Sequence, residues 1–237
     1  VSADENIVSM FGKHFNRGVI AMKNSDFDKA ALEFRLATIA DPENYTGYYQ
    51  HAQAVMRQAE AEKKLGNEEE FMALTDAVIR DLNRVLEIDP NDKEVTVTVH
   101  QAMGEVLYSR DDLPAAQASY QEAIKLSPEN YNLILTVADR FYNAQDWEKA
   151  AAYYQDALSV KERLNVVDDK DTANYSALGN ALSKLDRRAE AMAAYQKVLE
   201  LAPNDTGTLY NLMVTQYKAG EEAEKAGYEL LRLEDFL

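Results

Sequence analysis

The chain has 237 residues, 46% of them hydrophobic, and a formal net charge of -16. This acidic balance argues against general nucleic-acid binding, which needs clustered Lys and Arg to displace counterions, and against binding to anionic membrane surfaces. With only 9 Gly and 5 Pro, the chain has few residues for the turns of an all-β protein, so composition favours an all-α class.

The sequence also limits compartment and chemistry. It has no Cys, which excludes disulfides and thiol chemistry, and no apolar run of the roughly 18–20 residues that a transmembrane helix needs. The chain begins at Val1 and shows no basic segment followed by an apolar stretch. We therefore expect a soluble protein, either cytoplasmic or extracytoplasmic after removal of an N-terminal signal.

The first predicted helix pair spans 11–44. Small and apolar residues recur there at helical spacing, with Gly18 in the first helix and Pro42 ending the second. The polar turn between them contains Ser25 and Asp26, either of which can cap the second helix.

The second predicted pair, 45–92, is the longest. It has 14 more residues than the first, around 57–77, and its turn lies at Gly66-Asn67. Shared between both helices, this surplus adds about two turns to each. We expect the hairpin to project beyond its neighbours, either as inert length variation or as a dimer contact or lid.

The remaining pairs are predicted at 97–130, 131–164, 172–205 and 206–237. In the third pair the sequence VTVTV alternates like a strand, but its register favours a helix that starts near Lys93. In the fourth, Glu162 stands where other pairs have Pro, so the second helix should run on, and 165–171 is the longest polar connection. The last pair should end in a capping helix with a more polar outer face, or in a segment that docks on a neighbouring molecule.

One helix pair with a single apolar face cannot bury that face alone, and stacked pairs can. The recurring residues resemble those of the tetratricopeptide repeat, a 34-residue helix–turn–helix unit. The matching residues are Tyr175, Leu178, Gly179, Leu182, Ala191, Tyr195 and Pro203 in 172–205, and His14, Arg17, Gly18, Ala21, Ala30, Phe34 and Pro42 in 11–44. The resemblance implies an all-α, single-domain α-solenoid over 1–237. Such a solenoid is a right-handed superhelix whose first helices line a concave face that binds partner segments.

Helical geometry identifies the side chains of the first helices that should point into this groove. They are Phe15, Met22, Lys23, Tyr49, Gln53, Met56, Arg57, Gln101, Tyr108, Tyr142, Asn180 and Tyr217. Met and Tyr give adaptable and rigid apolar contact area, respectively. Alternatively, several of these side chains simply pack between first helices.

No catalytic or cofactor-binding pattern is found. The sequence has no phosphate loop, nucleophile elbow or metal motif, and His14, His51 and His100 fall at repeat positions typical of half-buried packing residues. We therefore predict a non-catalytic scaffold, without cofactor or metal, that binds a protein or peptide partner in the groove. The alternatives are a homo-oligomer that assembles through the extended hairpin or the C-terminal helix, and a small-molecule or lipid-binding module.

Overall fold

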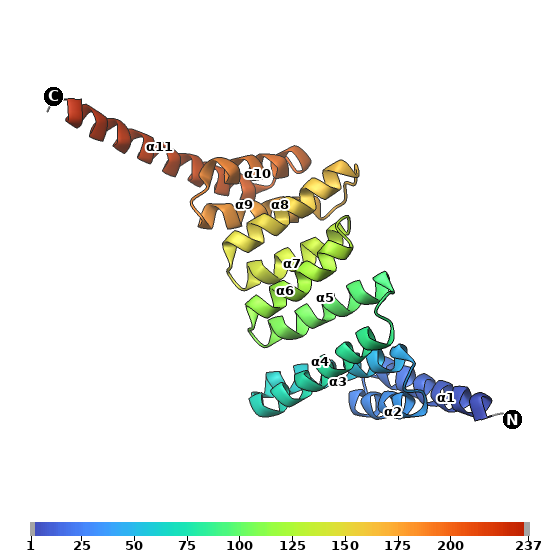
Figure 1. Ribbon diagram of the computed structural model, residues 1–237. Coiled ribbons are helices and arrows are strands. Elements are labelled where there is room, and N and C mark those ends of the chain that lie inside the picture. The colour runs from blue at the N-terminus through green and yellow to red at the C-terminus, as the bar shows by residue number, and fades with distance from the viewer. Residues whose placement is uncertain (1–2, 235–237) are drawn as a thin grey trace. The chain divides into compact units, whose positions relative to one another are not determined.

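The computed structural model describes the backbone of residues 3–234 and the side chains of residues 10–222 and 224 (Figure 1). Every secondary-structure element in this range is a helix: α1 (Ala3–Lys23), α2 (Phe27–Ala40), α3 (Tyr45–Leu65), α4 (Glu68–Ile88), α5 (Lys93–Ser109), α6 (Leu113–Leu126), α7 (Tyr131–Asn143), α8 (Trp147–Arg163), α9 (Asp171–Lys184), α10 (Arg188–Leu201) and α11 (Thr206–Glu234). The predicted all-α class is confirmed. None of these described helices is both long and apolar enough to cross a membrane.

The chain divides into two compact units, Val1–Ser127 and Pro128–Leu237. In the first unit α1 packs on α2, α3 on α4 and α5 on α6, while α2–α3 and α4–α5 contacts join successive pairs. In the second unit α7 packs on α8 and α9 on α10, with α8–α9 and α10–α11 contacts between them. Each unit is therefore a stack of helical hairpins, and a single domain over 1–237 stays a prediction.

Short polar turns set the start of the second helices. At α2, the side chain of Asp26 accepts a hydrogen bond from the backbone N–H of Lys29 at 3.2 Å, so Asp26 is the cap. Ser25 instead has a left-handed backbone, with φ 57°, and closes the turn. The same sequence of a left-handed residue and a capping Asp recurs before α6 and α8.

Close approach within the pairs depends on small residues. A Cβ atom built on Gly18 would lie 2.6 Å from Cε1 of Phe34, too short for any van der Waals contact. The same fit of a first-helix glycine against a second-helix ring joins Gly104 to Tyr120 and Gly179 to Tyr195. This repeated fit explains why 34-residue spacing was visible in the sequence.

Filling one of these contacts should destabilise the stack. In Gly104→Val the new side chain would overlap the Tyr120 ring, and we expect the free energy of unfolding to fall by about 1–3 kcal/mol. Urea unfolding measures the loss. The matched control is Gly12→Val in α1, where an added Cβ meets no heavy atom within 4 Å. Equal losses in both variants would contradict the proposed packing.

At three places the helices depart from the regular repeat in the way that the sequence predicts. The second pair is extended, because α3 and α4 have 21 residues each whereas α2 and α6 have 14. Helix α5 begins at Lys93 and includes the VTVTV segment. Helix α8 continues to Arg163, through the position where other pairs have Pro. These three predictions are confirmed.

The predicted terminal helix pair at 206–237 is wrong for the described residues. Helix α11 is one continuous helix of 29 residues from Thr206 to Glu234, and 235–237 lie outside the described residues. The physical reason lies around Ala219 and Gly220, which are followed by two Glu, good helix formers, rather than by a capping Asp or Asn. At the other end, α1 begins at Ala3, earlier than the predicted repeat at residue 11.

Candidate functional site

Four apolar side chains predicted for the groove lie half-buried against the hydrophobic core of the first unit. They are Phe15, Met22, Tyr49 and Met56. The ring of Phe15 stacks on Phe11 with centroids 5.4 Å apart and makes a T-shaped contact with the Phe34 ring, with centroids 5.6 Å apart. These residues therefore contribute to packing and offer only part of their surface to a partner.

The other predicted groove residues differ in the solvent exposure of their side chains. Lys23, Gln53, Arg57 and Tyr217 are exposed, whereas Gln101, Tyr108, Tyr142 and Asn180 are half-buried. Asn180 is engaged within the fold, because its Oδ1 accepts hydrogen bonds from the Tyr195 hydroxyl at 2.9 Å and from Nδ2 of Asn211 at 3.3 Å. Asn180 thus connects α9 to α10 and α11.

A pocket of about 310 Å³ opens between first helices α3 and α5 of the first unit. Its lining residues are Tyr45, Tyr49, Val85, Glu94, Val95, Thr98 and Val99. Val85 and Val99 are fully buried and form an apolar floor, while Glu94 and Thr98 are exposed. Among these residues, Tyr49 is one that the sequence placed in the groove. We call this cavity the α3–α5 pocket.

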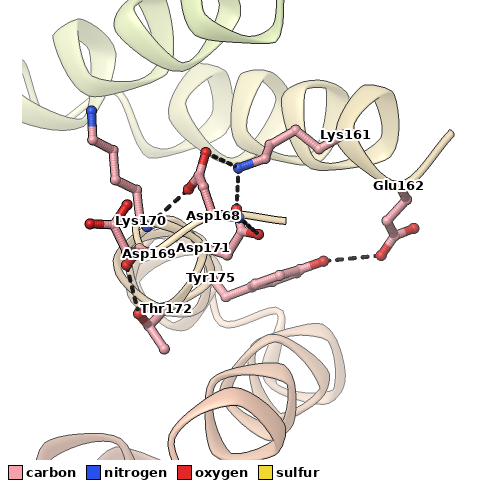
Figure 2. Close-up of polar contacts among 8 residues, drawn as sticks. All are labelled: Lys161, Glu162, Asp168, Asp169, Lys170, Asp171, Thr172 and Tyr175. Carbon is pink, nitrogen blue, oxygen red and sulfur yellow. Dashed lines mark hydrogen bonds and ion pairs between the residues drawn. The ribbon is translucent and has the colours of Figure 1, made fainter. Parts of the chain in front are cut away.

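The second unit contains a buried ion cluster that the sequence did not predict (Figure 2). Lys161, near the end of α8, has a side chain only 2% exposed, and its Nζ donates to Asp168 Oδ2 at 2.8 Å and to Asp171. Asp171 also accepts from the backbone N–H of Asp168 at 3.1 Å. We call Lys161, Asp168 and Asp171 the Lys161 clasp. It fastens the α8–α9 connection to α8.

The contacts within the Lys161 clasp favour the charged forms of Lys161 and Asp168. Burial lowers the pKa of Lys161, but its hydrogen bonds to Asp168 and Asp171 outweigh burial and raise the pKa above its ordinary value. The hydrogen bond from Lys161, with one from the backbone of Lys170, lowers the pKa of Asp168. Two carboxylates thus favour the protonated form of Lys161, which has no free electron pair to act as a nucleophile or general base. The contacts of Lys161 join α8 to the α8–α9 connection.

Beside the clasp lies a second pocket of about 340 Å³, with mixed lining. Leu158, Val166, Val167 and Leu201 form apolar walls, and Glu162, Asn165, Lys197 and Glu200 are polar. The Tyr175 hydroxyl donates to Glu162 at 3.0 Å, and burial, followed by this hydrogen bond, raises the Tyr175 pKa to about 12. The sequence signal for the Lys161 clasp is a Lys near the end of a helix, followed within ten residues by three Asp.

The histidines lie at half-buried positions of the helix pairs. All three are half-buried, and Nδ1 of His14 lies 2.7 Å from Glu33 while Nδ1 of His51 lies 2.6 Å from Asp81. Each of these two therefore joins the helices of its own pair. Within the described residues, no group of three or more His, Cys, Asp or Glu side chains is placed to hold a metal ion.

Comparison with known families identifies the repeat. Profiles of the tetratricopeptide repeat match residues 102–165 and 173–205. The chain is a tetratricopeptide repeat protein. The two matches leave a gap at 166–172, which contains Asp168 and Asp171. The Lys161 clasp therefore secures an insertion between two tetratricopeptide repeats.

Similar proteins agree with this fold. The peroxisomal targeting signal receptor of Saccharomyces cerevisiae is 31% identical over 110 residues, 46% of this chain and 17% of the receptor. Among solved structures, MamA superposes with a TM-score of 0.59 at 19% identity, covering 81% of this chain and 91% of MamA. YrrB, described as a tetratricopeptide repeat protein with an unusual peptide-binding site, gives 0.54 at 14% identity, covering 83% and 89%. The chain spans between 10% and 17% of the curated relatives that it matches.

Proposed function

We propose that this tetratricopeptide repeat protein is a non-catalytic interaction module that binds a segment of a partner protein on the first helices of its first unit. Proteins of this family act as modules for protein–protein interaction. The observation that carries the proposal is the α3–α5 pocket, which opens between two first helices and includes the predicted groove residue Tyr49. An apolar side chain of the partner would enter this pocket.

The lining defines the chemistry of the bound segment. The buried floor of Val85 and Val99 suits an aliphatic or aromatic side chain, and Tyr45 and Tyr49 offer rigid contact area with polar tips. The exposed carboxylate of Glu94 favours a cation next to that apolar residue, and the net charge of -16 would steer a basic segment toward the chain. We therefore expect an extended segment with an apolar anchor flanked by Lys or Arg.

The yeast relative supports a role in recognition, since its name describes a receptor for a targeting signal. Its match covers 17% of that receptor, so the nature of the signal does not transfer to this chain. What the relative contributes to the proposal is the recognition of a targeting signal by a protein that is similar to this chain over 110 residues.

Selection from a random peptide library displayed on phage tests the proposal with the full chain as bait. We expect enriched peptides with an apolar anchor and neighbouring basic residues. Val95→Trp would fill the α3–α5 pocket, and it should weaken binding of the enriched peptides at least about tenfold in a calorimetric titration, about 1.4 kcal/mol.

The matched control is Leu32→Trp, which adds the same ring to the exposed face of second helix α2, where Leu32 is 58% exposed. This control should bind the peptides like the unaltered chain. Peptides that bind Val95→Trp as tightly as the unaltered chain would overturn the pocket assignment, as would peptides that lose affinity equally in both variants.

That the protein is non-catalytic is part of this proposal. The small-molecule or lipid-binding alternative stays a prediction, and native mass spectrometry tests it. A mass above 26.7 kDa for the purified chain that is lost on denaturation would favour that alternative.

A further inference from the structure

Two departures from the 34-residue repeat meet at helix α5. At its start, the additional residues 93–96 bring Glu94 and Val95 into the lining of the α3–α5 pocket. At its end, the extended hairpin of α3 and α4 contacts Ser109 and Arg110. The added length of the second pair therefore acts on the same helix that forms one wall of the pocket.

The contacts at the end of α5 are polar, and they come from the lengthened part of the hairpin. Nζ of Lys63 donates a hydrogen bond to the backbone carbonyl of Ser109, the last residue of α5. Nη1 of Arg110 donates to Oδ1 of Asp76 at 2.6 Å, and the Arg110 side chain is only 19% exposed. Lys63 and Asp76 both lie within 57–77. We call Lys63, Asp76, Ser109 and Arg110 the α5 brace.

The position of Lys63 suits a cation in two ways. A positive charge at the C-terminal end of a helix interacts favourably with the helix dipole and with the last carbonyls, which lack partners within the helix. Nζ of Lys63 also lies 5.1 Å from the ring centroid of Phe71 in α4, a buried residue, and the face of an aromatic ring attracts a cation. Lys63 therefore holds the ends of α3, α4 and α5 together at one point.

Between the brace and the pocket, α5 rests on α4 through apolar side chains alone. The core cluster contains Val78, Leu82 and Val85 of α4 and Val99, Met103 and Val106 of α5. Such contacts are non-directional, and the crossing angles of packed helices scatter by about 15–20°. Helix α5 has 17 residues and is about 25 Å long. A rotation of about 10° would therefore move the end that lines the pocket by roughly 2–4 Å.

We propose that the α5 brace sets the width of the α3–α5 pocket by fixing the angle of α5 on α4. Lys63, Asp76 and Arg110 are then positioning residues for partner binding, an inference that rests on the proposed function of the pocket. They act without touching the partner, because a rigid helix connects them to the pocket wall. The extended hairpin supports the binding helix from the end opposite the pocket.

Charge reversal in the full chain tests the brace. Arg110→Asp places two carboxylates opposite each other, and a peptide selected on the unaltered chain should bind about fivefold more weakly in a calorimetric titration. Adding Asp76→Arg restores opposite charges at the same two positions and should return the affinity to within about twofold. Lys63→Met keeps a long side chain without the charge, and it should weaken binding about threefold.

The matched control is Arg163→Asp, which changes the net charge by the same amount. Nη2 of Arg163 lies 3.6 Å from Oε1 of Glu129 in the second unit, and these side chains are 62% and 66% exposed. Arg163→Asp should bind the peptide like the unaltered chain. Equal losses in Arg110→Asp and Arg163→Asp, or a loss that Asp76→Arg does not restore, would contradict the inference.

Methyl NMR of the free chain tests the geometry without a peptide. Val85, Val95 and Val99 line the pocket, and the last two lie toward the end of α5 opposite Arg110. With isotope-labelled valines, Arg110→Asp should shift the methyl resonances of all three. Asp76→Arg should reverse these shifts, and Arg163→Asp should leave the resonances unchanged.

The two measurements distinguish failure of this inference from failure of the proposed function. Peptides that bind Val95→Trp as tightly as the unaltered chain would refute the pocket as the binding site, and the valine resonances alone would then decide whether the brace sets its width. Unchanged valine resonances in Arg110→Asp would refute the brace in either case. Where Val95→Trp does weaken binding, unchanged peptide affinity in Arg110→Asp would also refute it.

Discussion

Lys161→Met should lower the free energy of unfolding of the second unit by about 3–5 kcal/mol. The side chain of Asp171 is only 7% exposed, and removing Lys161 leaves that carboxylate buried without its cation. A buried charge that loses its partner keeps the cost of desolvation without the compensating attraction. Urea unfolding followed by far-UV circular dichroism measures the loss.

Two further variants show whether charge is the cause. Adding Asp171→Asn to Lys161→Met removes the unpaired charge and should restore part of the stability. Lys197→Met breaks an ion pair with Glu200 in which both side chains are about half exposed or more, and it should cost less than about 1 kcal/mol. If Lys161→Met costs no more than Lys197→Met, the clasp does not stabilise the insertion.

The contribution of the clasp should also depend on pH. The pKa of Asp168 is lowered in the folded chain. The contribution of Asp168 to the free energy of unfolding is therefore complete above the ordinary pKa of 3.8 and is lost as the pH falls below that value. The pKa of Lys161 is raised in the folded chain. The contribution of Lys161 to the free energy of unfolding is therefore complete below the ordinary pKa of 10.5 and is lost as the pH rises through the pKa of the folded chain. The difference between the unaltered chain and Lys161→Met should therefore be constant between these limits.

Phe34→Ala should destabilise the first unit by about 3–5 kcal/mol. Phe34 is fully buried, and its ring lies against Gly18 and makes a T-shaped contact with the Phe15 ring. Removing the ring leaves a cavity between α1 and α2 that the close-packed backbone cannot collapse to fill. Leu32→Ala on the same helix, at a position 58% exposed, should change stability by no more than about 0.5 kcal/mol.

A double-mutant cycle tests the fit between Gly18 and Phe34. Gly18→Ala should destabilise the unaltered chain, because the new Cβ overlaps the ring. In the Phe34→Ala background the same change should be neutral or stabilising, since the cavity accepts the methyl group and Ala is the better helix former by about 1 kcal/mol. Additive effects would show that the two positions do not act together.

Much of the fold was predictable because the stabilising contacts recur along the chain. A glycine and an aromatic ring at fixed positions mark Gly18 with Phe34 and Gly179 with Tyr195 as equivalent pairs, and helix lengths followed from insertions relative to the 34-residue unit. The continuous α11 was missed, since an apolar pattern that resumes after Gly220 looks the same whether or not the helix turns there.

The sites were harder to predict because they depend on departures from the repeat. The Lys161 clasp joins residues seven and ten positions apart across a turn, and burial of a lysine cannot be read from helical periodicity. Equally, the groove prediction for Asn180 could not anticipate that Tyr195 and Asn211 occupy its amide oxygen. Position on a helix face is readable from sequence, whereas the partner that each side chain takes is set by packing.

Amide hydrogen–deuterium exchange of the full chain, with and without a selected peptide, tests the central claim of partner binding most directly. We predict that the peptide slows exchange in α3 and α5 around the α3–α5 pocket, and that Val95→Trp abolishes this protection while Leu32→Trp retains it. Protection confined to second helices α2, α4 and α6, or protection that survives Val95→Trp, would contradict the account.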